Sequence, residues 1–246
     1  MLPGIMRPLA AQGIRVVQTS SGAGAGNNIT VPLLNASIGN LVLFYFCTGI
    51  HPLSDGPLSS VTAGFTTIDW RFRSAMFNAK VVNALYARVI DGSDPSDIGV
   101  VGDGTDTAYA WVQLEIAGFG GDLGAGGAGD GISLAEDSEN SGATSTTVPV
   151  PDQTLPTGEV PSGDAIFLGL SGAAPISQTP VGVRAFAPAY TSGQIEQPGA
   201  GFPGHGGVTA IAGWRAGGSS VTGQGHLLSG SAWWMSNGIV IKGAGA

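Results

Sequence analysis

The chain has 246 residues, of which 42 are glycine, and only 11% are charged, against about 25% in an average domain. Its 9 basic and 17 acidic residues give a formal charge of −8, which argues against nucleic acid or an anionic membrane as the main partner. No apolar run approaches the roughly 18 residues of a membrane-spanning helix. The single cysteine, Cys47, excludes an internal disulfide.

The first residues predict an arm without a stable helix, because Pro3 and Pro8 would interrupt helical hydrogen bonding. The arm carries the large apolar side chains of Leu2, Ile5, Met6 and Leu9. Such side chains are unfavourable in water, so we expect the arm, residues 1–12, to contact another subunit. Ile14–Thr19 alternates and predicts a first strand, and the glycine-rich stretch Ser20–Asn28 predicts a flexible turn. We therefore divide the chain into an arm with the first strand, 1–19, and one β-sandwich domain, 20–246.

The stretch from Ile29 to Phe46 is central to the predicted fold. Its second part, Leu41–Phe46, is apolar at every position and rich in aromatic and β-branched side chains. A run of this length predicts a strand covered on both faces rather than a helix. Cys47 follows directly, and we expect it to be a buried, inert thiol.

Further strands are predicted where apolar residues recur at every second position, namely Gly64–Trp70, Val81–Ile90 and Tyr109–Ile116. In the last of these, the aromatic residues share one face and the aliphatic residues share the other. A glycine loop follows, Gly118–Gly131, and it matches the G-x-G-x-x-G pattern of dinucleotide sites. Acidic residues come directly after it and would repel a pyrophosphate, so we expect no nucleotide site.

The second half of the chain repeats motifs of the first half in the same order. Thr146–Pro149 echoes Ile29–Pro32, and Ser162–Leu168 echoes Ile38–Phe44. The pattern predicts two half-repeats, approximately 20–119 and 141–246, joined by a glycine- and acid-rich connector, 120–140.

The two halves could form two small sandwiches or supply the strands of one. We favour one sandwich, because four or five strands alone bury too little surface. The predicted fold is all-β, an antiparallel, jelly-roll-like β-sandwich built from two half-repeats, which limits exposed sheet edges.

The order of these signals resembles a family of β-sandwich virion proteins from tailed bacteriophages and prophages, of the head decoration or minor tail type. The matching segments begin at about Ser20 and are Ile29–Pro32, Gly39–Phe44, Gly64–Ile68, Tyr86–Pro95 and Trp111–Gly118. The sequence departs from the family pattern at Phe65, where the family usually has tryptophan, and in its long acidic middle. The resemblance implies a β-sandwich attached to the head or tail of a particle. It implies no catalytic residues.

Motifs for catalysis or metal binding are missing from the sequence. It has no G-x-S-x-G and no H-E-x-x-H, and its histidines, His51, His205 and His226, are dispersed. We expect the loop histidines to be solvated, with no cofactor and no metal. The segment Val89–Val183 holds 14 acidic residues and no basic one, which leaves 17 − 14 = 3 acidic residues elsewhere. We expect the loops Asp91–Asp106 and Gly120–Asn140 to form a solvated acidic rim at one end of the sandwich. The alternative is a Ca²⁺ site, with Asp91, Asp94 and Asp97 as candidate ligands, or Asp103 and Asp106 with nearby carbonyls.

Trp233 and Trp234 must point to opposite sides of a strand. We expect one in the core and the other either exposed, as a platform for sugars or proteins, or covered. The residues expected to contact partners are therefore Leu2, Ile5, Met6, Leu9, Trp233 and Trp234. The sequence predicts a non-enzymatic structural protein of a bacteriophage virion, assembled in the host cytoplasm. It would be a homo-oligomer, such as a trimer, that contacts other capsid or tail proteins as a decoration (cement) protein or tail component. The alternative is a receptor- or glycan-binding module of the tail.

Overall fold

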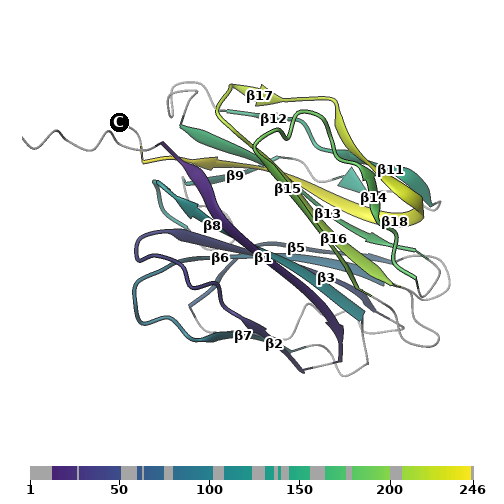
Figure 1. Ribbon diagram of the computed structural model, residues 1–246, viewed down its shortest axis with the longest axis horizontal. Coiled ribbons are helices and arrows are strands. Elements are labelled where there is room, and N and C mark those ends of the chain that lie inside the picture. The colour runs from purple at the N-terminus through teal and green to yellow at the C-terminus, as the bar shows by residue number, and fades with distance from the viewer. Residues whose placement is uncertain are drawn as a thin grey trace, which may run out of the picture.

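The computed structural model describes residues 13–26, 28–50, 60–62, 64–74, 80–101, 108–123, 131–135, 138–139, 144–155, 164–175, 179–199 and 207–244. Every regular element in these ranges is a β-strand, and every strand pair is antiparallel. The strands form two main sheets packed face to face, each with a smaller cover on its outer side (Figure 1). The predicted all-β, antiparallel sandwich is confirmed.

The first main sheet comes entirely from the N-terminal half. Its strands, in spatial order, are β1 (Arg15–Ala25), β8 (Ala108–Ala117), β3 (Leu41–Ile50), β6 (Lys80–Val89) and β5 (Thr66–Ser74). Its outer face is covered by a three-stranded sheet of β2 (Asn28–Pro32), β7 (Asp97–Val101) and β4 (Ser60–Val61).

The second main sheet comes from the C-terminal half. Its strands, in spatial order, are β10 (Ser138–Glu139), β18 (Gln224–Lys242), β13 (Ala165–Ala174), β16 (Val208–Ala216) and β15 (Gly193–Gly199). Three further strands pair with β18, namely β9 (Ile132–Leu134), β11 (Ser145–Val150) and β14 (Val183–Ala185). A separate pair is formed by β12 (Gln153–Thr154) and β17 (Ser220–Val221).

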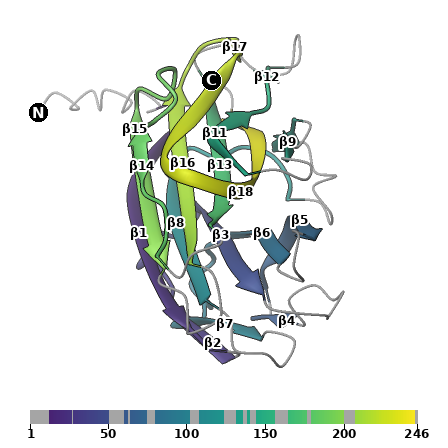
Figure 2. The same cartoon turned by 90° about the vertical axis from the view of Figure 1, so that its right-hand side faces the viewer.

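β18 is long and belongs to two layers. Its first residues pair with β11 and β14 in the outer cover, whereas Trp233–Lys242 pairs with β13 in the main sheet. The strand turns sharply between these parts, as the yellow ribbon of Figure 2 shows. One continuous strand therefore ties the cover to the sheet beneath it.

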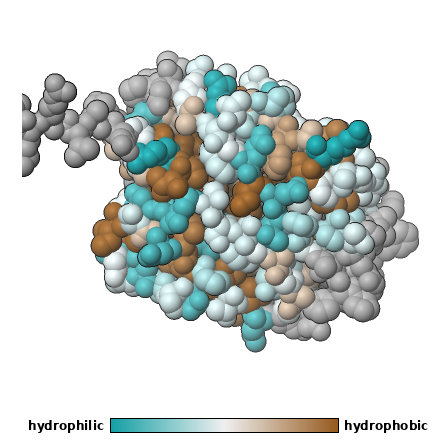
Figure 3. Space-filling model, viewed as in Figure 1, coloured by the Kyte–Doolittle hydropathy of each residue, from teal (hydrophilic) through white to brown (hydrophobic). Residues whose placement is uncertain are grey.

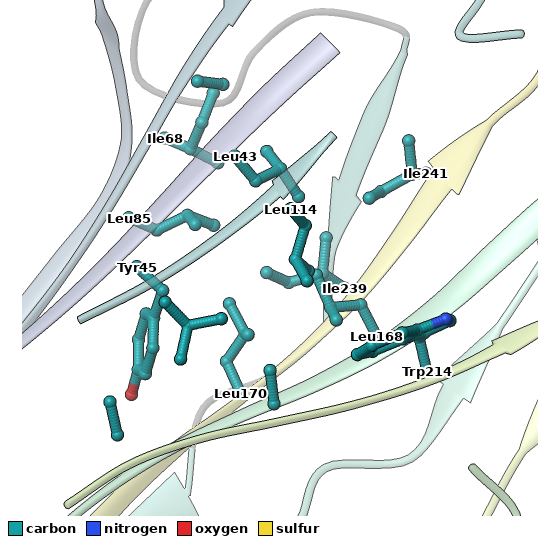
Figure 4. Close-up of a cluster of buried hydrophobic side chains, with 14 of the residues drawn as sticks. Leu43, Tyr45, Ile68, Leu85, Leu114, Leu168, Leu170, Trp214, Ile239 and Ile241 are labelled. Atoms are coloured by element: carbon teal, nitrogen blue, oxygen red, sulfur yellow. The ribbon is translucent and has the colours of Figure 1, made fainter. Parts of the chain in front are cut away.

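The two halves share one core between the main sheets (Figure 4). Leu43, Tyr45 and Leu114 of the first sheet face Leu168 and Ile239 of the second. Each half also has apolar clusters under its own cover. Hydrophobic burial on both faces explains why Leu41–Phe46 lacks alternation: Leu43 and Tyr45 enter the shared core, and the neighbouring phenylalanines lie under the first cover.

The strands of the two main sheets follow corresponding orders. β8-β3-β6-β5 in the first sheet corresponds in position to β18-β13-β16-β15 in the second. The strands that contain one pair of echoed motifs, β3 and β13, thus lie at corresponding positions, β3 between β8 and β6 and β13 between β18 and β16. The half-repeat and the jelly-roll path stay predictions.

The prediction of a flexible turn at Ser20–Asn28 is wrong, because β1 continues to Ala25. Its glycines serve packing: Gly22 pairs directly with Trp111, and a Cβ at position 22 would lie 2.5 Å from the indole ring. The aromatic ring can lie over the neighbouring strand only because that strand carries no side chain there. In the connector 120–140, β9 and β10 add strands to β18, and Ile132 is buried in the shared core.

Candidate functional site

The candidate site is a hollow at one end of the first main sheet, with a volume of about 390 Å³. One wall is the β2–β3 connection, with Leu33, Leu34 and Ile38, and the other is the β6–β7 connection, with Ile90 and Pro95. Backbone hydrogen bonds join the walls, from the Leu33 N–H to the Ser96 carbonyl (3.0 Å) and from the Gly39 N–H to the Ile90 carbonyl (2.8 Å). The hollow is thus bounded by two connections that lie far apart in sequence.

Two polar residues of β8 hold the β2–β3 wall. Gln113 is fully buried, accepts a hydrogen bond from the Leu34 N–H (3.1 Å) and donates one to the Pro32 carbonyl (2.8 Å). The Glu115 carboxylate, 3% exposed, accepts hydrogen bonds from three neutral donors: the Gln18 side chain (2.6 Å), the Ser37 N–H (2.8 Å) and the Asn40 side chain (2.5 Å). Charge-assisted hydrogen bonds of this kind are stronger than neutral ones, so the wall has a fixed position.

An ion pair holds the other wall. The Arg88 Nε donates to the Asp94 carboxylate at 2.5 Å, and its Nη2 lies 3.6 Å from Asp91. Asp94 also accepts the Asp91 and Gly92 N–H groups (3.2 and 2.9 Å), which closes the turn. Hydrogen bonds from Ser93 lower the pKa of the Asp91 carboxyl below its usual value. The segment Tyr86–Pro95 is therefore the end of β6 followed by a turn, and the polar groups of this turn bond to one another and to Arg88 of β6.

Asp91, Asp94 and Asp97 do not gather into a group that could hold a metal ion. No group of three or more potential ligands comes together among the residues that the structure describes. Asp91 and Asp94 are engaged within the turn, and Asp97 accepts a hydrogen bond from the Ser96 hydroxyl. The expectation that Asp91–Asp106 forms one loop at one end is wrong, because β7 runs through the middle of this segment.

Both predicted tryptophans are buried, with exposures of 6% for Trp233 and 5% for Trp234. They enter different clusters: Trp233 packs with Ala174 and Met235, and Trp234 lies under the second cover with Val148. Neither forms an exposed platform in the isolated chain. The arm residues Leu2, Ile5, Met6 and Leu9 and the Trp70 side chain lie outside the described residues.

The expectation of a solvated loop histidine is wrong for His226, which is fully buried on β18. Its Nδ1 accepts the Ala187 N–H (3.2 Å), and its ring stacks on Tyr190 with centroids 6.0 Å apart. Burial lowers its pKa from 6.5 to about 4. His51 and His205 lie outside the described residues. Burial also raises the pKa of the Cys47 thiol to about 12, and the predicted buried thiol is confirmed.

Comparison with models of protein families, with curated proteins and with solved structures finds no match. Within the described ranges no helix is long and apolar enough to cross a membrane. Sequence reasoning missed the hollow, because its walls are adjacent only in three dimensions. The one available signal was Ile38, an apolar residue between Ser37 and Gly39 in a turn, which is 74% exposed.

Proposed function

We propose that the chain is a non-enzymatic structural protein of a bacteriophage particle, an oligomeric accessory on the head or tail. The resemblance of its motifs to those of tailed-phage virion proteins motivates this proposal. The observation that carries it is the role of those motif residues in the structure. Arg88, Asp91 and Asp94 bond to one another and shape a turn. A motif whose polar groups are engaged in this way serves a scaffold rather than a reaction.

Four other buried polar side chains support the same proposal. Gln113 and Glu115 anchor a connection, and Asn83 and Asn237 tie the two main sheets together, bonding to the Met235 carbonyl (3.2 Å) and to Asp69 (2.8 Å). A nucleophile or general base has to present an unengaged group in a cleft. These polar groups instead hold strands and connections in place.

The direct test is to purify particles from the strain that encodes the chain and to quantify the chain in them by mass spectrometry. A fixed number of copies per particle, retained through a density gradient, is the expected result. A reconstruction of the same particles then places the chain on head or tail. Chain found only in the soluble fraction, at normal particle yield, would refute the proposal.

The glycan-binding alternative gains no support from Trp233 and Trp234, because both indoles are covered within the chain. Two results together would favour that alternative. The chain would bind a glycan array as strongly as a known lectin, and it would be absent from purified particles.

A further inference from the structure

The described surface gives only weak signals for a partner. In Figure 3 the face over β1 and β15 is a mosaic in which small apolar groups alternate with polar ones. Apart from Ile38 at the hollow, the exposed large apolar side chains are scattered and between 37% and 41% exposed: Val17, Val89, Val101 and Leu134. Scattered residues of this kind are normal on soluble proteins. The interior under the second cover, which consists of β11, β14 and the first residues of β18, is more informative.

Under this cover the second main sheet has a row of glycines. Gly169 of β13 pairs with Gly238 of β18 on one side and with Gly213 of β16 on the other. The Tyr190 side chain lies over this row. A Cβ at position 169 would be 2.5 Å from its hydroxyl oxygen, and a Cβ at position 213 would be 3.1 Å from its Cβ. The Gln153 amide reaches the same place and donates to the Tyr190 hydroxyl at 2.6 Å. The glycines therefore leave room for polar side chains between the sheet and its cover.

Ser171 belongs to the next row of the same sheet face. It follows Gly169 by two residues on β13, so its side chain points to the same side, about 7 Å along the strand. Its register partners are Ser236 and Ile211. The Ser236 hydroxyl donates to the Pro149 carbonyl of the cover. The Ser171 hydroxyl, in contrast, is fully buried and has no hydrogen-bond partner among the described residues.

His226 enters this layer from the cover, above the row of Ser171. Its ring stacks on the Tyr190 ring, with centroids 6.0 Å apart and planes 28° apart. Its register partner on β11 is Val148, which shares an apolar cluster with Ile211. Ile211 is the register partner of Ser171. The His226 ring therefore lies between the Tyr190 ring on the glycine row and the apolar cluster of the next row.

The hydrogen bond that His226 makes fixes its tautomer. Its Nδ1 accepts the Ala187 N–H, so the neutral ring carries its proton on Nε2. This Nε2–H is buried and, like the Ser171 hydroxyl, has no hydrogen-bond partner among the residues that the structure describes. Buried polar groups in native proteins are satisfied by protein atoms or by ordered water. A donor on the cover and a hydroxyl on the sheet thus face the same layer without a partner.

We infer that this layer binds one ordered water molecule, which accepts a hydrogen bond from His226 Nε2 and donates one to the Ser171 hydroxyl oxygen. The ligand is small and uncharged, because both residues are fully buried and an ion in such a layer would need an opposite charge beside it. Interior sites with two or more polar partners hold water, whereas apolar cavities stay dry. Gln153 Oε1, which is also buried and unpartnered within the described ranges, is a further acceptor in this layer. The water joins the cover to the main sheet, and this inference is independent of the proposed function.

A crystal structure of the full-length protein that resolves ordered solvent tests the inference. We expect a water molecule whose oxygen lies about 2.7–3.2 Å from both His226 Nε2 and Ser171 Oγ. A structure with no water between these two atoms would overturn the inference. So would a direct hydrogen bond between them.

Relaxation dispersion of oxygen-17 in the solvent counts long-lived internal waters in solution and gives an independent measurement. Ser171→Val removes the acceptor and places methyl groups in the space of the water. We expect this variant to hold one long-lived water fewer than wild type, whereas Ser219→Val, at an exposed site of the second half, should match wild type. Equal numbers in wild type and Ser171→Val would contradict the inference. If Ser171→Val does not fold, the wild-type crystal structure still decides.

Discussion

The buried His226 ring should make the fold sensitive to acid. In the folded chain its pKa is lowered from 6.5 to about 4 by burial, and the neutral rings of Phe186 and Tyr190 pack against it. Above pH 6.5 the ring is neutral in both the folded and the unfolded chain, so its titration does not change the free energy of unfolding. Between pH 6.5 and about 4 the unfolded chain binds a proton that the folded chain does not, so the free energy of unfolding falls as the pH falls. A pKa difference of about 2.5 corresponds to about 3 kcal/mol, fully lost below pH 4.

The matched variant is His226→Asn, because the Asn Oδ1 can replace Nδ1 as the acceptor for the Ala187 N–H. Other groups titrate in both proteins, so the difference between them isolates the ring. We expect wild type to be the more stable protein at pH 7 in urea unfolding followed by tryptophan fluorescence. That advantage should shrink by about 3 kcal/mol by pH 4. A difference in unfolding free energy that is constant from pH 7 to pH 4 would refute the reasoning.

Three further outcomes are expected. Glu115→Ala removes the acceptor that three donors share and should cost about 2–4 kcal/mol, with faster proteolysis of the 33–40 connection than in wild type. Equal proteolysis of this connection would show that the carboxylate does not anchor it. Gly22→Ala forces the Trp111 ring to move and should cost about 1–3 kcal/mol in chemical unfolding, whereas Ala25→Ser at an exposed site of the same strand should cost little. Deletion of residues 1–12 should leave the circular dichroism spectrum and melting temperature nearly unchanged but reduce the mass found by light scattering; an unchanged assembly would contradict the role given to the arm.

The sequence was informative where a residue's role depends on its own strand. The unbroken apolar run Leu41–Phe46 predicted burial on both faces, and the structure confirms it. Alternation in Tyr109–Ile116 correctly placed Trp111 on one face and Leu114 on the other. Both signals follow from the two-residue period of a strand, which is independent of the neighbouring strands.

The sequence was uninformative where a role depends on a partner far along the chain. From the local sequence, Gly22 predicts a turn. Its place within β1 is explained only by the Trp111 ring of the neighbouring strand, which lies over it. Glu115 on β8 has no nearby basic residue that would indicate a buried anchor, because its donors lie 75 to 97 residues away. The hollow likewise joins two connections that are brought together by sheet formation, and no local pattern encodes that contact.

Because β18 is continuous, the two halves should differ in how well they tolerate an inserted peptide between a cover strand and a main-sheet strand. In the N-terminal half, six residues separate the cover strand β7 from the main-sheet strand β8, whereas β18 performs both roles without a break. A foreign peptide inserted between Val101 and Ala108 would lengthen a connection, at a cost that grows only slowly with length. The same peptide inserted at Ser229–Ser231 would interrupt the strand that joins two layers. Inserted peptides should therefore be tolerated between Val101 and Ala108, and accepted at Ser229–Ser231 only at a large loss of stability.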